Sequence, residues 1–140
     1  MMKHTILILF LFLSLLCHGQ SYKFFTTDRE LSSSLINKIY QDRNGMIWIA
    51  TEDGLNRYDG AKFITYKHDP ENEYSLCHNY VRVLYEDSKG RLFVGTYNGI
   101  QLYDPETDSF SARAQWEDGK TFDSNIMSIL ERRNGEIWVS

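Results

Sequence analysis

Three short turn sequences recur at a fixed spacing along this chain. They are Asn44-Gly45, Lys89-Gly90 and Asn134-Gly135, and consecutive glycines lie 45 residues apart both times. A period of this length, with matching residues around each turn, indicates an array of similar supersecondary units that stack on one another. The repeat overrides the usual expectation that a chain of about 140 residues forms one ordinary domain.

The middle copy reads as four strands joined by turns. Asp87 can accept hydrogen bonds from backbone N–H groups ahead of it, and Gly90 can adopt the positive φ that a tight turn requires. Runs of β-branched, aromatic and other apolar residues stand between the turns. The predicted strands span residues 81–86, 92–94, 100–103 and, more weakly, 110–115.

The first and third copies align with the middle one at the same spacing. The first has Asp42 and Gly45 at its turn, whereas the third keeps Gly135 but has Arg132 where the others have aspartate. That turn loses a side-chain acceptor, yet Asn-Gly is a strong hairpin signal by itself. The predicted turn residues are therefore Asp42, Gly45, Asp87, Gly90 and Gly135.

Four antiparallel strands in about 45 residues make one blade of a β-propeller, so the predicted fold class is all-β. The second strand is apolar on both faces, which fits burial between stacked blades, and Trp48, Phe93 and Trp138 are predicted to lie in the core there. A β-sandwich, the alternative, does not predict near-identical units at constant spacing. The predicted parts are a signal peptide (1–19), a lead-in (20–33), blade 1 (34–78), blade 2 (79–123) and a partial blade 3 (124–140).

These parts predict an incomplete propeller of about two and a half blades. A closed propeller has about 4–8 blades. We expect such a piece to expose a bare sheet edge and therefore to be unstable or self-associating.

The N-terminus has the pattern of a secretory signal peptide. Lys3 and His4 precede an apolar run over residues 6–16, and small residues at 17 and 19 suit cleavage before Gln20. A membrane anchor would need about 20 apolar residues. A lipoprotein anchored at residue 17 is a further alternative, disfavoured because the residue before it is a bulky leucine. The mature protein is expected in the periplasm or another extracytoplasmic space.

The composition of the mature chain limits the kinds of partner that it is expected to bind. The leader holds one of the 15 basic residues and none of the 19 acidic ones, so an excess of five acidic residues remains. Nucleic acid and anionic membrane surfaces are therefore poor candidate ligands. Only Cys77 remains after cleavage, so an internal disulfide is impossible, and we expect a small, partly buried residue there.

The repeat resembles the two-component regulator propeller repeats. The resemblance is carried by Asp42-Arg43-Asn44-Gly45, by Ile47-Trp48-Ile49-Ala50-Thr51 and by Gly54-Leu55-Asn56-Arg57-Tyr58-Asp59. It implies paired propellers in the periplasmic sensor of a hybrid histidine kinase, a dimer anchored in the inner membrane whose related sensors respond to glycans or their breakdown products. The kinase, the receiver and a membrane span after the leader are not in this chain, so the segment itself is predicted to be non-enzymatic.

Motifs that could carry chemistry have simpler explanations. The Asp42 turn lacks the glycine and glutamate positions of a calcium-binding EF-hand loop. His68 and His78, with Cys77, lack further ligands at metal-binding spacing. Paired carboxylates such as Glu52-Asp53 show neither a defined separation nor a raised pKa. The sequence therefore predicts no catalytic residue, no metal and no cofactor.

Strand topology indicates where a ligand would bind. In an antiparallel four-stranded blade, the loop between strands two and three opens on the same face as the connection to the next blade, and loops on rigid scaffolds usually carry function. A glycan-sensing segment is the leading hypothesis. The alternatives are a secreted propeller enzyme acting on polysaccharide and a non-catalytic interaction scaffold. The predicted ligand-binding residues are Glu52, Asp53, Tyr97, Asn98, Asn72, Tyr74 and His78.

Overall fold

The structure is a computed structural model that describes residues 21–26, 30–115 and 119–140. The predicted signal peptide lies outside the described residues. Within these ranges no helix is long and apolar enough to cross a membrane.

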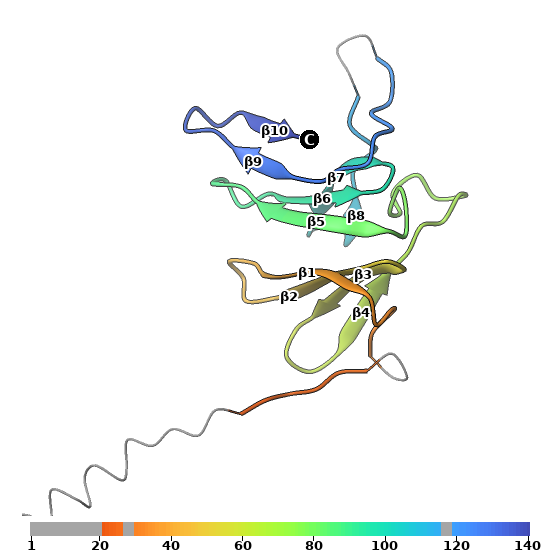
Figure 1. Ribbon diagram of the computed structural model, residues 1–140, viewed down its shortest axis with the longest axis vertical. Coiled ribbons are helices and arrows are strands. Elements are labelled where there is room, and N and C mark those ends of the chain that lie inside the picture. Colours follow the sequence, from red (N-terminus) through yellow and green to blue (C-terminus); the bar gives the residue numbers. More distant parts are fainter. Residues whose placement is uncertain (1–20, 27–29, 116–118) are drawn as a thin grey trace, which may run out of the picture.

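The described residues form two complete four-stranded antiparallel sheets and one hairpin (Figure 1). In each sheet the strands follow one another in chain order, as the repeat predicts. The strands of the first sheet, blade 1, are β1 (Ile36–Gln41), β2 (Ile47–Thr51), β3 (Gly54–Tyr58) and β4 (Phe63–Tyr66). Those of blade 2 are β5 (Val81–Glu86), β6 (Leu92–Thr96), β7 (Gly99–Asp104) and β8 (Ser109–Phe110), and the hairpin contains β9 (Ile129–Glu131) and β10 (Ile137–Val139).

The sheets stack face to face, with β1 beside β5 and β5 beside β9 (Figure 1). β1 and β5 share the same irregularity, because the register of each shifts near its start, between Ile36 and Lys38 and between Val81 and Val83. The repeat of the sequence is thus a repeat of backbone geometry as well. β8 is shorter than the predicted fourth strand over 110–115, because only Tyr103 and Asp104 of β7 pair with it.

The two interfaces between sheets contain the apolar core. Trp48 is 1% exposed and packs in a cluster with Leu84, Val94 and Phe110 of blade 2. The second cluster joins blade 2 to the hairpin, and partly buried Phe93 packs against it. Trp48 therefore lies in the core, as predicted, whereas Phe93 is only partly buried against the second cluster.

Trp138 does not lie in a core, contrary to the prediction. Its side chain is 58% exposed. In the described part of the chain, no sheet covers that face of β10, whereas the equivalent residues of β2 and β6 are covered by blade 2 and by the hairpin. The residue type is the same as at position 48, but burial here depends on the neighbouring sheet.

The turns between the first and second strands are held by a side-chain carboxylate. Oδ1 of Asp42 accepts the backbone N–H groups of Asn44 and Met46, and its Oδ2 accepts the indole N–H of Trp48 at 2.8 Å. Oδ1 of Asp87 likewise accepts the N–H of Lys89, at 3.0 Å. These contacts explain why aspartate opens the first two turns.

The partner of the carboxylate changes from copy to copy. In blade 2 the tryptophan is replaced by Phe93, which has no N–H, and Nε of Arg91 donates to Oδ2 of Asp87 at 2.6 Å instead. In the hairpin the charges are exchanged, because Glu136 accepts from both Arg132, at 3.1 Å, and the indole of Trp138, at 3.4 Å. Glu136 thus supplies the carboxylate that the repeat leads one to expect at position 132.

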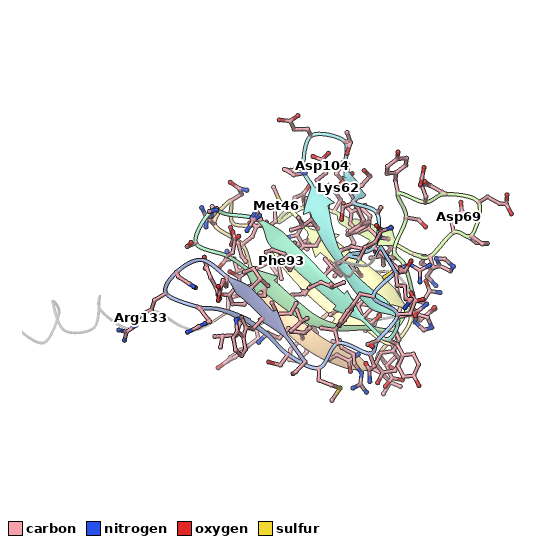
Figure 2. All side chains as sticks on the ribbon, turned by 90° about the horizontal axis from the view of Figure 1, so that it is seen from above. Met46, Lys62, Asp69, Phe93, Asp104 and Arg133 are labelled. Atoms are coloured by element: carbon pink, nitrogen blue, oxygen red, sulfur yellow. The ribbon has the colours of Figure 1, made fainter. Side chains whose placement is uncertain are left out.

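A second recurring contact ties each sheet to the next. The backbone N–H of Arg43, in the first turn, donates to Glu86 at the end of β5 at 3.1 Å. The backbone N–H of Ser88, in the second turn, donates in the same way to Glu131 at the end of β9, at 2.8 Å. Both turns lie at one end of the sheets, which we call the turn face; the opposite end, with the turns at 51–54 and 96–99 and the connecting segments, is the loop face (Figures 1 and 2).

An arginine-centred cluster also joins blade 1 to blade 2. The guanidinium of Arg57 lies 5.6 Å from the ring centroids of Trp48 and Tyr66 and 5.7 Å from that of Tyr103. Asp108 accepts hydrogen bonds from Arg57 at 2.8 Å, Tyr66 at 2.5 Å and Tyr103 at 2.7 Å. Burial raises the pKa of the Asp108 carboxyl, but the bonds from both tyrosines and the charge of Arg57 outweigh it and hold the pKa below its usual range.

Acid should weaken this cluster. Because the pKa of Asp108 is lower in the folded state than the unfolded value of about 3.9, its stabilisation is present above that pH and is lost as the pH falls through the folded pKa. We expect Asp108→Asn to flatten the loss of stability between neutral pH and about pH 3. Urea unfolding midpoints across this range, for both proteins, measure the effect. Parallel pH profiles would contradict the assignment.

Candidate functional site

The candidate site lies on the loop face, where a group of aromatic rings meets an acidic turn. The ring centroid of Tyr97 lies 5.6 Å from that of His78 and 6.1 Å from that of Tyr80. The hydroxyl of Tyr80 donates to Oε1 of Glu52 at 2.8 Å. We call these four residues (Glu52, His78, Tyr80 and Tyr97) the loop-face cluster. It spans the junction between blade 1 and blade 2.

The turns between the second and third strands of both blades share the same hydrogen bond, which fixes the backbone that carries these side chains. The hydroxyl of Thr51 donates to the carbonyl of Gly54 at 2.8 Å, and Thr96 does the same to Gly99 at 3.1 Å. The N–H of Tyr97 then donates to the carbonyl of Tyr80 at 2.9 Å. These bonds leave the ring of Tyr97 55% exposed on a rigid turn.

Asp53 is half-exposed, but both of its carboxylate oxygens have partners within the protein. One oxygen accepts from Lys67 at 2.6 Å and the other from the side chain of Asn79 at 3.1 Å. The N–H of Gly54 also donates to the carbonyl of Asn79, at 2.7 Å. The predicted binding residue Asp53 therefore fastens the connecting segment to the turn below it.

The structure separates Asn72 and Tyr74 from the cluster. Asn72 closes a local turn, because its Oδ1 accepts the N–H of Tyr74 at 3.0 Å. The carbonyl of Tyr74 accepts the N–H of Phe110 at 2.9 Å, so this part of the segment covers the outer edge of β8. Of the seven predicted residues, Glu52, Asp53, Tyr97 and His78 contact one another's neighbours at the junction, Asn98 bonds only within its own turn beside Tyr97, and Asn72 and Tyr74 lie on the rim.

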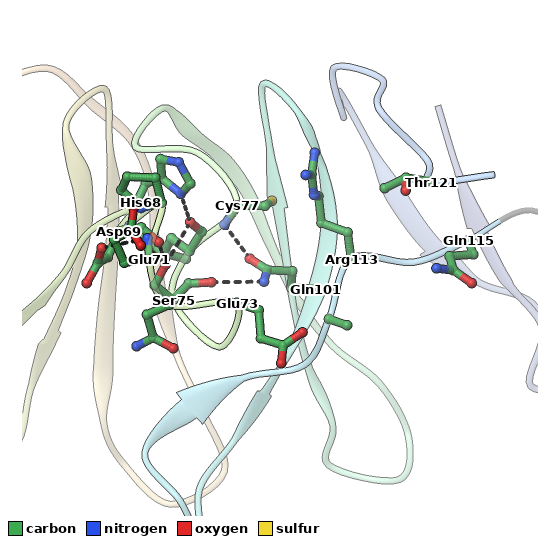
Figure 3. Close-up of a pocket in the computed structure, with 14 residues that line it drawn as sticks. His68, Asp69, Glu71, Glu73, Ser75, Cys77, Gln101, Arg113, Gln115 and Thr121 are labelled. Atoms are coloured by element: carbon green, nitrogen blue, oxygen red, sulfur yellow. Dashed lines mark hydrogen bonds between the residues drawn. The ribbon is translucent and has the colours of Figure 1, made fainter. Parts of the chain in front are cut away.

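A polar cavity of about 480 Å³ opens beside the cluster, between the connecting segment on one side and residues 112–115 and Thr121 on the other (Figure 3). Gln101 lies in its wall and is buried. Its amide nitrogen donates to the carbonyls of Ser75 and Ser111, and its oxygen accepts the N–H of Cys77 at 2.7 Å. Arg113 is paired with Asp123 at 2.8 Å. The wall is therefore rigid and already hydrogen-bonded, and carboxylates such as Glu73 line the cavity.

The thiol and imidazoles near the cavity have structural partners. Burial raises the pKa of the Cys77 thiol, which lies 3.2 Å from the hydroxyl of Thr96, so the thiol is a poor nucleophile. Nδ1 of His68 lies 2.6 Å from the carbonyl of Leu76, and Nδ1 of His78 accepts the N–H of Tyr80. No group of three or more metal-ligating side chains occurs in the ranges that the structure describes.

Sequence reasoning missed Tyr80, Lys67 and Asn79. A signal for Tyr80 was present, because the equivalent positions of the other copies hold Leu35 and Asn125. An aromatic residue that departs from the repeat beside a loop indicates a local role. The pairing of Lys67 with Asp53 depends on the path of the connecting segment, which the sequence does not reveal.

Comparisons with known proteins agree with this architecture. The family model described as two-component regulator propeller matches residues 30–53 and 75–98. Each matched stretch begins in the segment before a first strand and ends at the turn after a second strand. The repeat thus includes Leu31 and Ser32, which correspond to Leu76 and Cys77.

Similar proteins include a much longer kinase and extracellular domains of known structure. Histidine kinase P4 of Formosa agariphila is 40% identical over 73 residues, which are 49% of this chain and 5% of that protein. The extracellular domain of BT3049, a proposed hybrid two-component system of B. thetaiotaomicron, is 28% identical with a TM-score of 0.70, over 84% of this chain and 17% of that one. The extracellular domain of BT4673 from the same organism is 24% identical with a TM-score of 0.69, over 87% of this chain and 18% of that one, and supports the fold.

This chain therefore spans less than a fifth of the length of these relatives. The matched stretches, the period of 45 residues and the stacked sheets agree with one another. Residues 30–53 and 75–98 are therefore similar to two-component regulator propeller repeats, and the stacked four-stranded sheets are β-propeller blades.

Proposed function

We propose that this chain is part of the extracytoplasmic ligand-sensing propeller of a two-component sensor, and that its ligand is a glycan or a glycan breakdown product. The similarity to the extracellular domain of a hybrid two-component system and the match to two-component regulator propeller repeats support the sensor role and the location. Catalysis would belong to a kinase elsewhere in a longer, membrane-anchored and dimeric parent protein.

The composition of the loop-face cluster is our reason for proposing a glycan as the ligand. Sugars present apolar C–H faces that pack on aromatic rings, together with hydroxyl groups that donate to carboxylates. Tyr97 offers an exposed ring, and Glu52 lies within hydrogen-bonding distance of the neighbouring Tyr80. Binding sites of this kind combine aromatic walls with a few fixed polar groups.

Two matched tyrosine substitutions test the site. Tyr97 and Tyr74 are both 55% exposed, but only Tyr97 belongs to the cluster. We expect Tyr97→Ala to weaken oligosaccharide binding about tenfold, because tyrosine is enriched among the few contact residues whose truncation costs more than about 1 kcal/mol. Tyr74→Ala should leave binding unchanged.

Isothermal titration calorimetry of the purified protein against a panel of neutral and acidic oligosaccharides provides the measurement. If only Tyr74→Ala weakened binding, the ligand site would lie at the rim of the connecting segment and not at the loop-face cluster. Absence of binding across the panel would contradict the glycan proposal, and glycan turnover by the protein would favour a propeller enzyme instead.

A further inference from the structure

The irregular start of β5 carries an arginine where blade 1 has an asparagine. The register shift of β1 leaves Asn37 without a residue opposite it, and the shift of β5 does the same for Arg82, 45 residues later. Bulges of this kind redirect a side chain and are common beside binding sites. Nδ2 of Asn37 donates to the carbonyl of Val81 at 2.8 Å, which joins the two sheets. The side chain of Arg82 makes different contacts.

The guanidinium of Arg82 lies against the loop-face cluster. Its Cζ is 5.1 Å from the ring centroid of Tyr80, and that ring is 6.1 Å from the ring of Tyr97. Nη1 of Arg82 donates to the sulfur of Met127, the equivalent residue of the third copy. A thioether is a weak acceptor, and Met127 is 60% exposed. The ring and the thioether therefore position the guanidinium without neutralising its charge.

Arg82 differs from the other arginines that lie over aromatic rings. Arg57, Arg91 and Arg132 each face a ring, and each also pairs with a carboxylate. Among the described residues, no carboxylate pairs with Arg82, and its buried Nε has no hydrogen-bond partner. Buried donors without partners are rare, because their lost bonds to water are not replaced. Arg82 therefore keeps donors that suit an oxyanion.

A second polar atom without a partner lies close by. Oδ1 of Asn125 is buried and accepts no hydrogen bond from any residue that the structure describes. Nδ2 of Asn125 lies 3.5 Å from the sulfur of Met127, so Met127 contacts both Asn125 and Arg82. Methionine is flexible and repacks readily. A ligand that displaces Met127 reaches a charged donor and an amide acceptor, which suit an oxyanion and a hydroxyl group.

We propose that Arg82 binds the acidic group of a sugar, a uronate carboxylate or a sulfate ester, beside the loop-face cluster. The inference rests on the proposed glycan-sensing function and narrows its ligand to acidic saccharides. A guanidinium forms two parallel hydrogen bonds with an oxyanion, and stacking on Tyr80 fixes its plane. Tyr97 then packs on the sugar face, and Glu52 accepts from a hydroxyl group. The acidic charge of the whole chain opposes binding only weakly, because physiological salt screens charges beyond about 8 Å.

Calorimetric titration of the purified protein tests the proposal with three sets of oligosaccharides: oligouronates, their carboxyl-reduced neutral counterparts and sulfated forms of those neutral sugars. We expect the protein to bind an acidic set about tenfold to a hundredfold more tightly than the neutral set, the usual strength of charge-assisted hydrogen bonds. The two acidic sets distinguish a carboxylate from a sulfate. Arg82→Gln should abolish the preference and leave neutral affinity unchanged. Arg82→Lys should retain part of it, because lysine keeps the charge but lacks the planar fork.

Arg133→Gln is the matched control, because it removes the same charge from an exposed turn at the other end of the sheets (Figure 2). It should bind all three sets as the parent does. Urea midpoints verify that the variants are folded, and Arg82→Lys decides the outcome if Arg82→Gln unfolds.

Two results would overturn the assignment of Arg82 but not the proposed function. The first is equal affinity of the parent for acidic and neutral sugars, with Tyr97→Ala weakening both. The second is a loss in Arg82→Gln that is the same for acidic and neutral sugars, or the same as the loss in Arg133→Gln. Absence of binding to all three sets would overturn the assignment and the proposed function together.

Discussion

Replacing Trp48 with alanine should lower the free energy of unfolding by about 3–5 kcal/mol, the cost of emptying a large aromatic site in a core. The side chain is 1% exposed and touches both blades, with its ring 4.7 Å from that of Tyr103 and 5.6 Å from the guanidinium of Arg57. Small domains are stable by about 5–15 kcal/mol, so this one substitution removes a large part of the total.

Trp48→Phe separates the packing from the hydrogen bond. It keeps most of the ring but removes the indole N–H that donates to Asp42, and a hydrogen bond to a charged group is worth about 1.5–3 kcal/mol. Urea unfolding followed by far-ultraviolet circular dichroism measures both variants.

Trp138→Ala is the matched control for Trp48→Ala. Because Trp138 is exposed, its removal should change stability by no more than about 0.5 kcal/mol. Comparable losses for Trp48→Ala and Trp138→Ala would show that position 48 is not an interface core.

Replacing Glu86 with alanine should cost about 2–3 kcal/mol, because several hydrogen bonds between blades end on one carboxylate. Its side chain is 6% exposed and accepts from the backbone N–H of Arg43, from Nε of Arg43 at 2.5 Å and from the hydroxyl of Tyr40 at 3.1 Å. Removing the carboxylate leaves these donors without their acceptor at the junction of blades 1 and 2.

A double-mutant cycle with Arg43→Ala apportions the effect of Glu86→Ala. The backbone donor of residue 43 survives in Arg43→Ala, so Glu86→Ala should remain costly in that background. Glu106→Ala, in the exposed turn before β8, provides the control and should be nearly neutral. The role of Glu86 as a tie between blades would be refuted by a loss no greater than that of Glu106→Ala.

The sequence predicted the fold well because periodic turns and strands are local signals. Asp42 and Gly45 specify their hairpin through bonds within a few residues, and Gly45 has the positive φ expected of it. The short pairing of β8 was not predictable, since it depends on how the connecting segment covers an outer edge. The prediction that Trp138 is buried failed because burial of this position requires a neighbouring sheet, which the residue's own sequence context does not reveal.

The site was predicted only in outline. Topology correctly brought Glu52, Tyr97 and His78 to one end of the sheets. It did not show that Asp53 is tied by Lys67, because the path of a long connecting segment is set by contacts between residues far apart in sequence. Strand topology therefore predicts which face of the sheets carries a site. It does not predict which individual side chains on that face remain available for a ligand.

The exchanged charges at Arg132 and Glu136 indicate how the sequences of individual repeats can change while the turn keeps its hydrogen bond. The three hairpins share a bond between an acid and a donor near the second strand, although the acid stands before the turn in two copies and after it in the third. Such an exchange needs two substitutions, and either one alone would leave two like charges or an unmatched charge at the turn. A degenerate blade can therefore be recognised by searching for paired changes at these two positions, where a search for the aspartate alone would pass over it.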